Sequence, residues 1–394
     1  MSVIIKNAQL LLPDGRIVFG NLSFENGVIT ALSENEIASG YSDEVYDAAG
    51  NYLSAGFIDL HTHGAGGYDF MDGSEEAFLK AAEMHARHGT TSLCPTTLLS
   101  TNDELFETFD IYNRVKKKNF SGAQFLGLHL EGPYFSYNQR GAQDPKYLRN
   151  PSPDEYLKIL DASDEILRWS LAPELEGALD FGKELRARHI LPSIAHTDAI
   201  FEDILLAYQA GFSHVTHLYS CMSSITRRNA YRYAGAIEAA YMIDDMTVEI
   251  IADGVHLPKS LLQFVYKFKG ADRIALVTDS MRGAGMPDGP SILGSLKRGQ
   301  PVIIEDGVAK LPDRSAFAGS VATADRLVRT MVQVAGVPLP DAVKMMTATP
   351  ARIIGVNDRK GRIEIGLDAD LVLFDKEIDI KMTIVNGRIV YNSI

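Results

Sequence analysis

The chain has 394 residues, 46% of them hydrophobic, which is enough for one large barrel and a minor domain. Its formal net charge of −13 argues against a nucleic-acid partner, because proteins that bind the phosphate backbone usually display basic patches. The two cysteines, Cys94 and Cys221, are too few for a zinc site built from thiolates and argue against a disulfide framework. Neither a signal peptide nor an apolar run of about 18 residues is recognisable, so we expect a cytoplasmic protein without a membrane partner.

The first ~50 residues carry the pattern of short strands joined by tight turns. Residues 3–12 are strand-like, and Asn26-Gly27 lies between two β-rich arms, which is a strong hairpin signal. From about Ala55 onward, apolar strand-like runs alternate with amphipathic helical segments. One helix is expected to begin after Ser74 and to stop at Gly89.

This alternation continues to about residue 355, and it implies a parallel sheet of the α/β class. The expected strands are residues 57–60, 91–93, 125–130, 169–171, 190–194, 214–216, 247–251 and 274–278. Eight strands separated by helices imply a (β/α)8 TIM-type barrel. A hairpin-like insert is expected over residues 302–309.

The C-terminal end returns to the pattern of the first residues. Residues 370–375 read as a strand, and Asn386-Gly387 marks a second hairpin. We therefore expect a small β-sandwich domain formed by both chain termini. The predicted division is residues 1–54 and 361–394 for the β-sandwich and residues 55–360 for the catalytic, metal-dependent barrel.

Side chains that bind metals close several of the predicted barrel strands. His61 and His63 are one residue apart on a strand, so both point to the same side. Glu131, His196 and His217 also lie at strand ends, which converge on the face of a barrel where active sites form. Imidazole and carboxylate groups suit zinc and other divalent first-row metals. The last three residues would form one metal site, and the first two part of a second.

Asp279 follows the last predicted barrel strand and would complete the second metal site. A carboxylate beside an activated water can take its proton and deliver it to a leaving nitrogen. The alternative is a helix N-cap, a role that Asp commonly fills. With the other five residues present, catalysis is the favoured interpretation.

Other histidines and arginines carry weaker indications. His256 could be a further ligand, a substrate contact or a structural residue. Arg228 follows Arg227 in a loop, where most arginine pairs are solvated, although near a metal site a guanidinium is a natural clamp for phosphate or carboxylate. The remaining histidines fall into two groups. His129 and His214 lie inside strands and are expected to be structural, and His85, His88 and His189 are expected to be solvated.

Together these segments resemble the amidohydrolase superfamily and, within it, the N-acetylglucosamine-6-phosphate deacetylases. The resemblance covers nearly the whole chain. Its most specific motif is His129-Leu130-Glu131-Gly132-Pro133, whereas the His-x-His strand is shared across the superfamily. The matching segments are residues 56–64, 129–133, 141–142, 195–197, 216–219, 251–256, 278–281 and 318–320.

The resemblance implies the same barrel and terminal β-sandwich. It also implies a metal-dependent hydrolase that removes the acetyl group from an N-acetylamino sugar 6-phosphate, with N-acetylglucosamine 6-phosphate as the favoured substrate. It implies Glu131, His196 and His217 as metal ligands and Asp279 as the acid/base. The cofactor would be one or two divalent ions. Zn²⁺ is the favoured metal, and Fe²⁺, Mn²⁺ and Co²⁺ are the alternatives. The partners would be the amino sugar phosphate and a second copy of the chain in a homodimer. In this family the histidine that corresponds to His256 can reach across the dimer interface. The expected substrate contacts are Ala142, Ser220, Cys221, Arg228, His256, Phe317, Ala318 and Gly319.

The substrate contacts depart from the family pattern, whereas the metal residues do not. Ser220-Cys221-Met222 stands where the family usually has Asn-Ala-Met, Gln143 stands where a histidine is common, and the loop that holds Arg228 is longer. Alternative substrates are therefore N-acetylgalactosamine 6-phosphate, an unphosphorylated amino sugar, an N-acyl amino acid or a cyclic amide of the dihydroorotase type. Many of those other enzymes carry a metal-bridging lysine where this chain has Glu131. A non-catalytic sugar-phosphate sensor would require a lost ligand, and none is missing.

Overall fold

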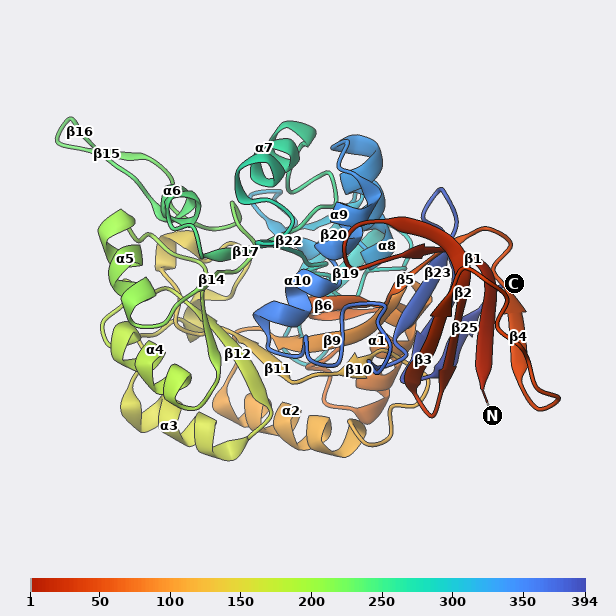
Figure 1. Ribbon diagram of the computed structural model, residues 1–394. Coiled ribbons are helices and arrows are strands. Elements are labelled where there is room, and N and C mark those ends of the chain that lie inside the picture. The colour runs from red at the N-terminus through yellow and green to blue at the C-terminus, as the bar shows by residue number, and fades with distance from the viewer. Residues whose placement is uncertain (1) are drawn as a thin grey trace.

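The computed structural model describes residues 2–394, and it confirms the predicted fold class (Figure 1). A parallel sheet forms the barrel. The ring closes where Ser280, just after the last barrel strand, forms a parallel bridge with Thr62 at the end of the first strand. A short strand, β10 (Gln124–Phe125), pairs with β9 beside this ring. The barrel strands, in order around the ring, are β6 (Phe57–Thr62), β9 (Thr90–Thr97), β11 (Leu128–Glu131), β12 (Ile166–Leu171), β13 (Leu191–Ile194), β14 (His214–Val215), β17 (Thr247–Ile250) and β18 (Ile274–Leu276).

Helices cover the outside of the barrel, and the first two begin at side-chain caps (Figure 1). In α1 (Glu75–Arg87) the Ser74 hydroxyl accepts a hydrogen bond from the backbone of Ala77, and α2 (Asn102–Val115) begins with a capping box of Thr101 and Glu104. Their buried faces pack on the strands. The other helices are α3 (Pro153–Ala162), α4 (Ala178–Ala187), α5 (Phe201–Gln209), α6 (Ala236–Met242), α7 (Lys259–Lys269), α8 (Ala324–Arg329), α9 (Leu339–Lys344) and α10 (Ala348–Ile353), with single turns at Tyr137–Gln139, Pro145–Tyr147 and Thr330–Val334.

Both chain ends contribute to one separate, mostly antiparallel sheet, as predicted. Asn26-Gly27 and Asn386-Gly387 both have positive φ, the conformation that tight hairpin turns require. The sheet encloses its own apolar core, which includes Leu22, Leu53 and Leu371. Its strands are β1 (Val3–Leu11), β2 (Ile17–Glu25), β3 (Val28–Ser33), β4 (Glu44–Asp47), β5 (Tyr52–Ala55), β23 (Leu371–Phe374), β24 (Ile380–Val385) and β25 (Arg388–Asn392). We propose that the two domains divide near residues 54 and 361, where the chain passes between this sheet and the barrel.

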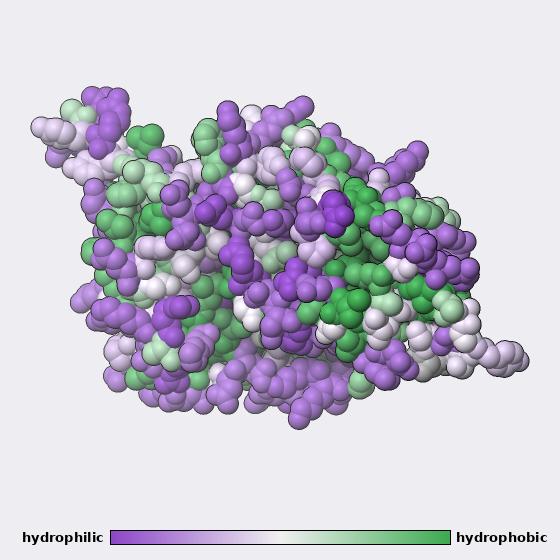
Figure 2. All heavy atoms as spheres, viewed as in Figure 1, coloured by the Kyte–Doolittle hydropathy of each residue, from purple (hydrophilic) through white to green (hydrophobic). Residues whose placement is uncertain are grey.

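Two additions to the barrel shape its open end. The predicted insert belongs to a four-stranded antiparallel sheet of β19 (Gly289–Leu293), β20 (Gln300–Glu305), β21 (Val308–Lys310) and β22 (Phe317–Ser320). A hairpin of β15 (Thr226–Arg228) and β16 (Tyr231–Tyr233) projects from the body as a narrow arm (Figures 1 and 2). Short strands β7 (Gly64–Ala65) and β8 (Tyr68–Asp69) follow the first barrel strand. Within residues 2–394, no helix is long and apolar enough to span a membrane.

Candidate active site

Six predicted site residues converge at the carboxyl ends of the barrel strands. They form two groups, each with ligand atoms within 4.8 Å of one another, and all six side chains are buried. The first group is Glu131, His196 and His217, and the second is His61, His63 and Asp279. The structure thus brings together every residue that the sequence assigned to metal binding or to acid/base chemistry. Their roles stay predictions.

Glu131 links the two groups through its two carboxylate oxygens. Oε1 lies 3.0 Å from Nε2 of His217 and 3.3 Å from Nε2 of His196. Oε2 lies 3.5 Å from Nε2 of His63. Burial alone would raise the pKa of Glu131, but the surrounding imidazoles outweigh it and hold the pKa well below its usual range. Glu131 is therefore an anionic bridge between the two groups.

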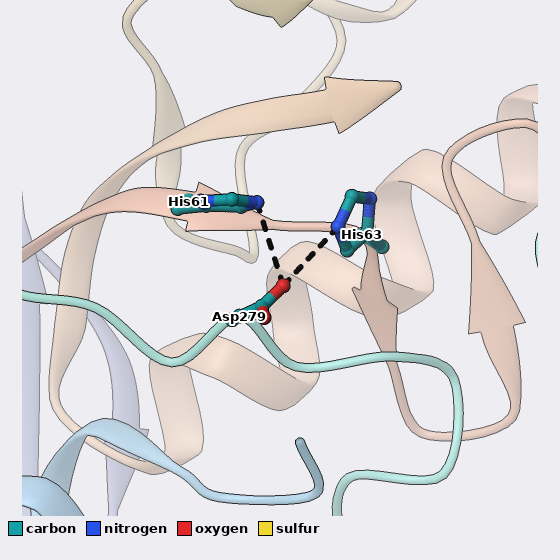
Figure 3. A group of neighbouring side chains, drawn as sticks. All are labelled: His61, His63 and Asp279. Carbon is teal, nitrogen blue, oxygen red and sulfur yellow. Dashed lines mark ion pairs between the residues drawn. The ribbon is translucent and has the colours of Figure 1, made fainter. Parts of the chain in front are cut away.

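His61 and His63 both point toward Asp279 (Figure 3). The Oδ1 atom of Asp279 lies 3.4 Å from Nε2 of His61 and 3.2 Å from Nε2 of His63. Burial would lower the pKa of His63, but Asp279 and Glu131 raise it to about 9. Burial likewise opposes ionisation of Asp279, yet His61 and His63 outweigh it and lower its pKa. The two carboxylates therefore require a cation between them, which is either a proton or a metal ion.

The unpaired atoms of this cluster fit a metal ion. Nε2 of His61 is buried without a hydrogen-bond partner, although buried polar atoms are normally paired. It faces Oε1 of Glu131 at 3.6 Å and Oδ1 of Asp279 at 3.4 Å. Imidazole nitrogens and carboxylate oxygens form the donor set that divalent first-row metals prefer. These six residues are therefore suited to hold one or two divalent ions.

The backbone turns sharply at three of these residues. His196, His217 and Asp279 have φ values of 47°, 27° and 46°, in the left-handed region that non-glycine residues rarely adopt. Each comes just after a strand, and the turn aims its side chain across the barrel mouth. Such a conformation costs about 1–3 kcal/mol, and strained residues of this kind cluster at active sites. Its repetition here supports a functional role for these strand ends.

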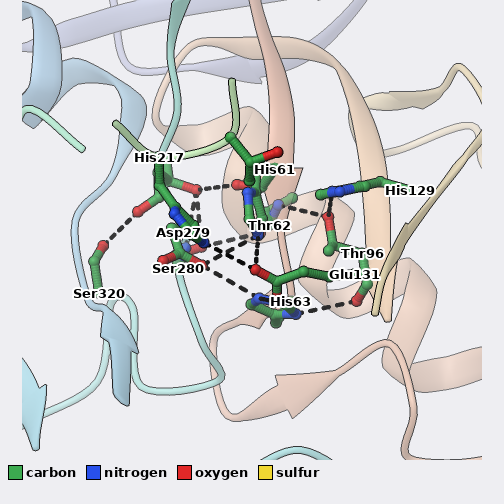
Figure 4. Close-up of polar contacts among 12 residues, drawn as sticks. His61, Thr62, His63, Thr96, His129, Glu131, His217, Asp279, Ser280 and Ser320 are labelled. Atoms are coloured by element: carbon green, nitrogen blue, oxygen red, sulfur yellow. Dashed lines mark hydrogen bonds and ion pairs between the residues drawn. The ribbon is translucent and has the colours of Figure 1, made fainter. Parts of the chain in front are cut away.

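Hydroxyl groups and backbone atoms hold the cluster from outside (Figure 4). The Thr62 hydroxyl contacts Ser280 at 3.0 Å and Nε2 of His85 at 2.9 Å. His85 is only 2% exposed, so the expectation that it is solvated is wrong. Its position on α1 faces the barrel, and the hydroxyl satisfies its ring nitrogen. His129, as expected, is a structural residue, with hydrogen bonds to Thr96 and Ser170.

A cavity of about 340 Å³ opens beside the two groups. This volume is within the range of small-molecule sites. Six of the predicted substrate contacts line it: Ala142, Ser220, Cys221, His256, Phe317 and Gly319. Ala318 lies between Phe317 and Gly319 on β22, but its side chain is buried and does not line the cavity. Arg228 lies on the projecting hairpin, exposed and outside the cavity lining of its own chain.

His256 is held in a fixed orientation at the cavity wall. Its Nδ1 lies 2.8 Å from Oδ2 of Asp253, and its ring packs 4.8 Å from that of Phe317. Burial would raise the pKa of Asp253, but the hydrogen bond from His256 outweighs it and lowers the pKa. Because the carboxylate accepts a hydrogen bond from Nδ1, the Nε2 atom is left for the cavity. This geometry supports a substrate contact for His256.

Cys221 occupies the point where this chain departs from the family pattern. Its φ is 53°, and a Cβ added at Gly141 would lie 2.7 Å from its sulfur, so the glycine makes room for the thiol. Burial would lower the pKa of His196, but Cys221 and Glu131 raise it well above its usual value. The thiol therefore lies at the edge of the first metal group.

Some lining residues were not expected to contact substrate. Gln143 donates from Nε2 to Oε2 of Glu131 at 3.0 Å and so belongs to the site. Its position next to the Gly141-Ala142 motif was the available clue. The others are Leu98, Tyr219, Leu293 and Ala316. The lining, as described for residues 2–394, includes no lysine or arginine.

Comparisons with known proteins identify the family of the chain and agree with its fold. A model of the amidohydrolase family matches residues 52–390. An N-acetylglucosamine-6-phosphate deacetylase of Lysinibacillus sphaericus is 34% identical over 99% of this chain and 98% of that protein. An N-acetylgalactosamine-6-phosphate deacetylase of Escherichia coli O157:H7 is 29% identical over 99% of both. The crystal structure of N-acetylglucosamine-6-phosphate deacetylase from Pasteurella multocida superposes with a TM-score of 0.91 at 28% identity and 99% coverage of both chains. The chain therefore belongs to the amidohydrolase family and, within it, to the N-acetylglucosamine-6-phosphate deacetylases.

Proposed function

We propose that the protein hydrolyses N-acetylglucosamine 6-phosphate to glucosamine 6-phosphate and acetate. The observation that carries this proposal is the pair of histidine–carboxylate groups joined by Glu131, with Asp279 at the cavity. Full-length relatives named as deacetylases of this substrate support the choice of reaction. The products follow from adding water across one amide bond.

The metal centre would use both groups of ligands. Glu131, His196 and His217 would hold one divalent ion, and His61, His63 and Asp279 a second. We propose Zn²⁺, because sets of three nitrogen and oxygen ligands are typical of catalytic zinc sites. A divalent ion in such a site acts as a Lewis acid, which activates water and polarises the amide carbonyl.

Asp279 would move the proton. Its carboxylate is ionised, since its pKa is lowered, so it can accept a proton from the attacking water. The same carboxyl group would then donate that proton to the amide nitrogen as the carbon–nitrogen bond breaks. The leaving group departs as a neutral amine, and acetate is released.

The phosphate would be bound by a residue from a second copy of the chain. A phosphate dianion calls for a cation, and the described cavity lining supplies no lysine or arginine. Arg228 is on the arm that projects from the body in Figures 1 and 2. Its guanidinium lies 5.4 Å from the centre of the Tyr233 ring on the same arm. We therefore place the arm against a partner in a homodimer, where Arg228 would reach the partner's cavity. The cytoplasmic location stays a prediction.

A panel of N-acetylated sugars, with and without a 6-phosphate, tests the proposed function. Acetate release should be fastest with N-acetylglucosamine 6-phosphate and much slower with the plain sugar. N-acetylgalactosamine 6-phosphate is the second candidate, since one full-length relative is named for that substrate and Ser220-Cys221 alters the cavity. A faster rate with the galacto epimer would reassign the substrate, and no release from any phosphorylated sugar would contradict the proposal.

A further inference from the structure

A buried carboxylate lies inside the barrel beneath the metal-binding residues. Glu249 is on β17 and is fully buried. Its Oε2 lies 3.4 Å from Nδ1 of His61 and 3.3 Å from the backbone nitrogen of His217. Its Oε1 pairs with the guanidinium of Arg168 and lies 3.1 Å from Nε2 of His214. All four neighbours are groups that can donate hydrogen bonds.

The charge of this cluster fixes which atoms carry protons. Arg168 is fully buried and permanently charged, so its partner Glu249 is stable there as a carboxylate. An ionised carboxylate only accepts hydrogen bonds. The facing nitrogens of His61 and His214 must therefore both be protonated.

This requirement determines the state of His61 toward the metal centre. A neutral imidazole that is protonated at Nδ1 has a lone pair at Nε2. That Nε2 is the buried atom without a hydrogen-bond partner, and it faces the carboxylates of Glu131 and Asp279. In the opposite tautomer, Nε2 would point a hydrogen at those carboxylates and would no longer be a ligand. A metal ligand is therefore available only while Nδ1 keeps its proton.

His61 differs from the neighbouring ligands in how it is held. Nδ1 of His63 lies 3.3 Å from the backbone oxygen of Thr96, and Nδ1 of His196 lies 2.7 Å from that of Gln139. Carbonyl oxygens accept hydrogen bonds whatever the side chain is. The acceptor for His61 is instead a side chain, Glu249, which a substitution can change.

We propose that Glu249 is a positioning residue that holds His61 in the tautomer able to bind the second metal ion. The inference rests on the proposed metal centre and not on the identity of the substrate. Partners of this kind usually orient ligating histidines, and their loss typically costs about 10- to 100-fold in metal affinity. Glu249 would thus decide whether the chain holds one ion or two.

Glu249→Gln tests the inference, because the amide keeps the size of the side chain but has one acceptor oxygen and one donor nitrogen. If the oxygen stays with Arg168, the amide nitrogen faces His61 and favours the opposite tautomer. The first metal group should change little, because the backbone of Leu218 bonds to the backbone oxygen of Glu249 at 2.8 Å and continues to place His217. His214→Gln is the matched control, since it disturbs Oε1 of the same carboxylate and leaves Oε2 facing His61.

The measurement is a zinc titration of the metal-free protein by calorimetry, with thermal melting as a check on folding. We expect two ions in the unmutated protein and in His214→Gln. In Glu249→Gln the second ion should bind about 10- to 100-fold more weakly, with the first unchanged within about threefold. If Glu249→Gln does not fold, Glu249→Asp, which keeps the carboxylate but shortens its reach, should show an intermediate loss confined to the second ion.

Two unchanged affinities in a folded Glu249 variant would overturn the inference, as would an equal loss in His214→Gln. A single ion in the unmutated protein would remove the second site and the inference with it. The titration needs no substrate, so a failure to release acetate would count against the proposed function alone.

Discussion

Nε2 of His63 lies 3.2 Å from Oδ1 of Asp279, so a predicted metal ligand and the predicted proton carrier are in direct contact. The two residues come from opposite ends of the barrel strand order, just after β6 and β18. The backbone bonds between them fix this contact, since His63 donates to the carbonyl of Ser280 and Asp279 to that of His61, both at 2.8 Å. Substitutions here should therefore affect chemistry more than folding.

Asp279→Asn keeps the shape of the side chain but removes its ability to accept a proton. We expect kcat to fall by about 10²–10⁴-fold, the usual contribution of general acid–base catalysis, while KM changes little. Steady-state kinetics with the phosphorylated substrate measure both parameters. An increase in KM with kcat unchanged would make Asp279 a binding residue instead.

His61→Ala should lower the metal content from two ions per chain to one, because it removes a ligand of the second group only. Elemental analysis of purified protein gives the number directly. His189→Asn is the control, since it removes an exposed histidine with a φ of 61° that asparagine tolerates. One ion in the unmutated protein, unchanged by His61→Ala, would show that the histidine pair does not bind metal.

Arg228→Ala should lower kcat/KM for phosphorylated sugars by about 10- to 100-fold, the scale of one charge-assisted hydrogen bond, and barely change it for plain sugars. Arg228→Lys should recover part of the loss, because lysine keeps the charge without the planar fork. Arg227→Ala, next to it on the same exposed strand, is the control. Equal losses with both classes of sugar would exclude a phosphate contact.

Mixing two impaired variants tests whether Arg228 acts across a dimer. Arg228→Ala and Asp279→Asn homodimers should each be impaired with the phosphorylated substrate. After subunit exchange, half of the dimers are mixed, and one of their two sites combines Asp279 with the partner's Arg228. Activity should rise to roughly a quarter of the unmutated level, as expected for a symmetric two-site dimer. No recovery, with exchange verified by mass, would place Arg228 elsewhere.

His85 should make the fold sensitive to acid. Burial and the charge of His88 lower the pKa of His85 to about 3, whereas in the unfolded chain it is about 6.5. The unfolded chain therefore binds a proton between these values and the folded chain does not. The stabilisation is complete above pH 6.5 and is lost toward pH 3 as the pH falls.

His85→Gln, which cannot titrate, removes this effect. The difference in unfolding free energy between the two proteins should shrink by about 2 kcal/mol from pH 7.5 to pH 5. Urea denaturation at both pH values provides the two differences. A difference that does not change with pH would mean that the pKa of His85 is the same in the folded and the unfolded chain.

The barrel and the metal residues could be predicted because their patterns are local. The strand before His61 carries apolar residues on both faces apart from Asp59, as in parallel sheets, and the His-x-His spacing fixes two ligands at once. The helix after Ser74 has both a cap and a glycine stop, and the structure places it at Glu75–Arg87. These features depend on neighbours in the sequence and not on tertiary contacts.

The network beneath the site could not be predicted because its partners are distant in the chain. Arg168 and Glu249 stand alone in apolar strands, which marks each as unusual, but only the barrel closes them into a pair. His85 has a helical spacing that fits either face of α1, so its burial depends on packing against Thr62. The position of Arg228 depends on a hairpin that leaves the body, which a loop-like sequence does not indicate.

The central claim is metal-dependent removal of the acetyl group, and the most direct measurement is acetate release from N-acetylglucosamine 6-phosphate before and after metal removal. The zinc-loaded protein should release one acetate for each glucosamine 6-phosphate formed. Chelation followed by buffer exchange should abolish turnover, and added Zn²⁺ should restore it in the unmutated protein but not in His196→Ala. Full activity in a preparation shown by elemental analysis to contain no metal would contradict the account.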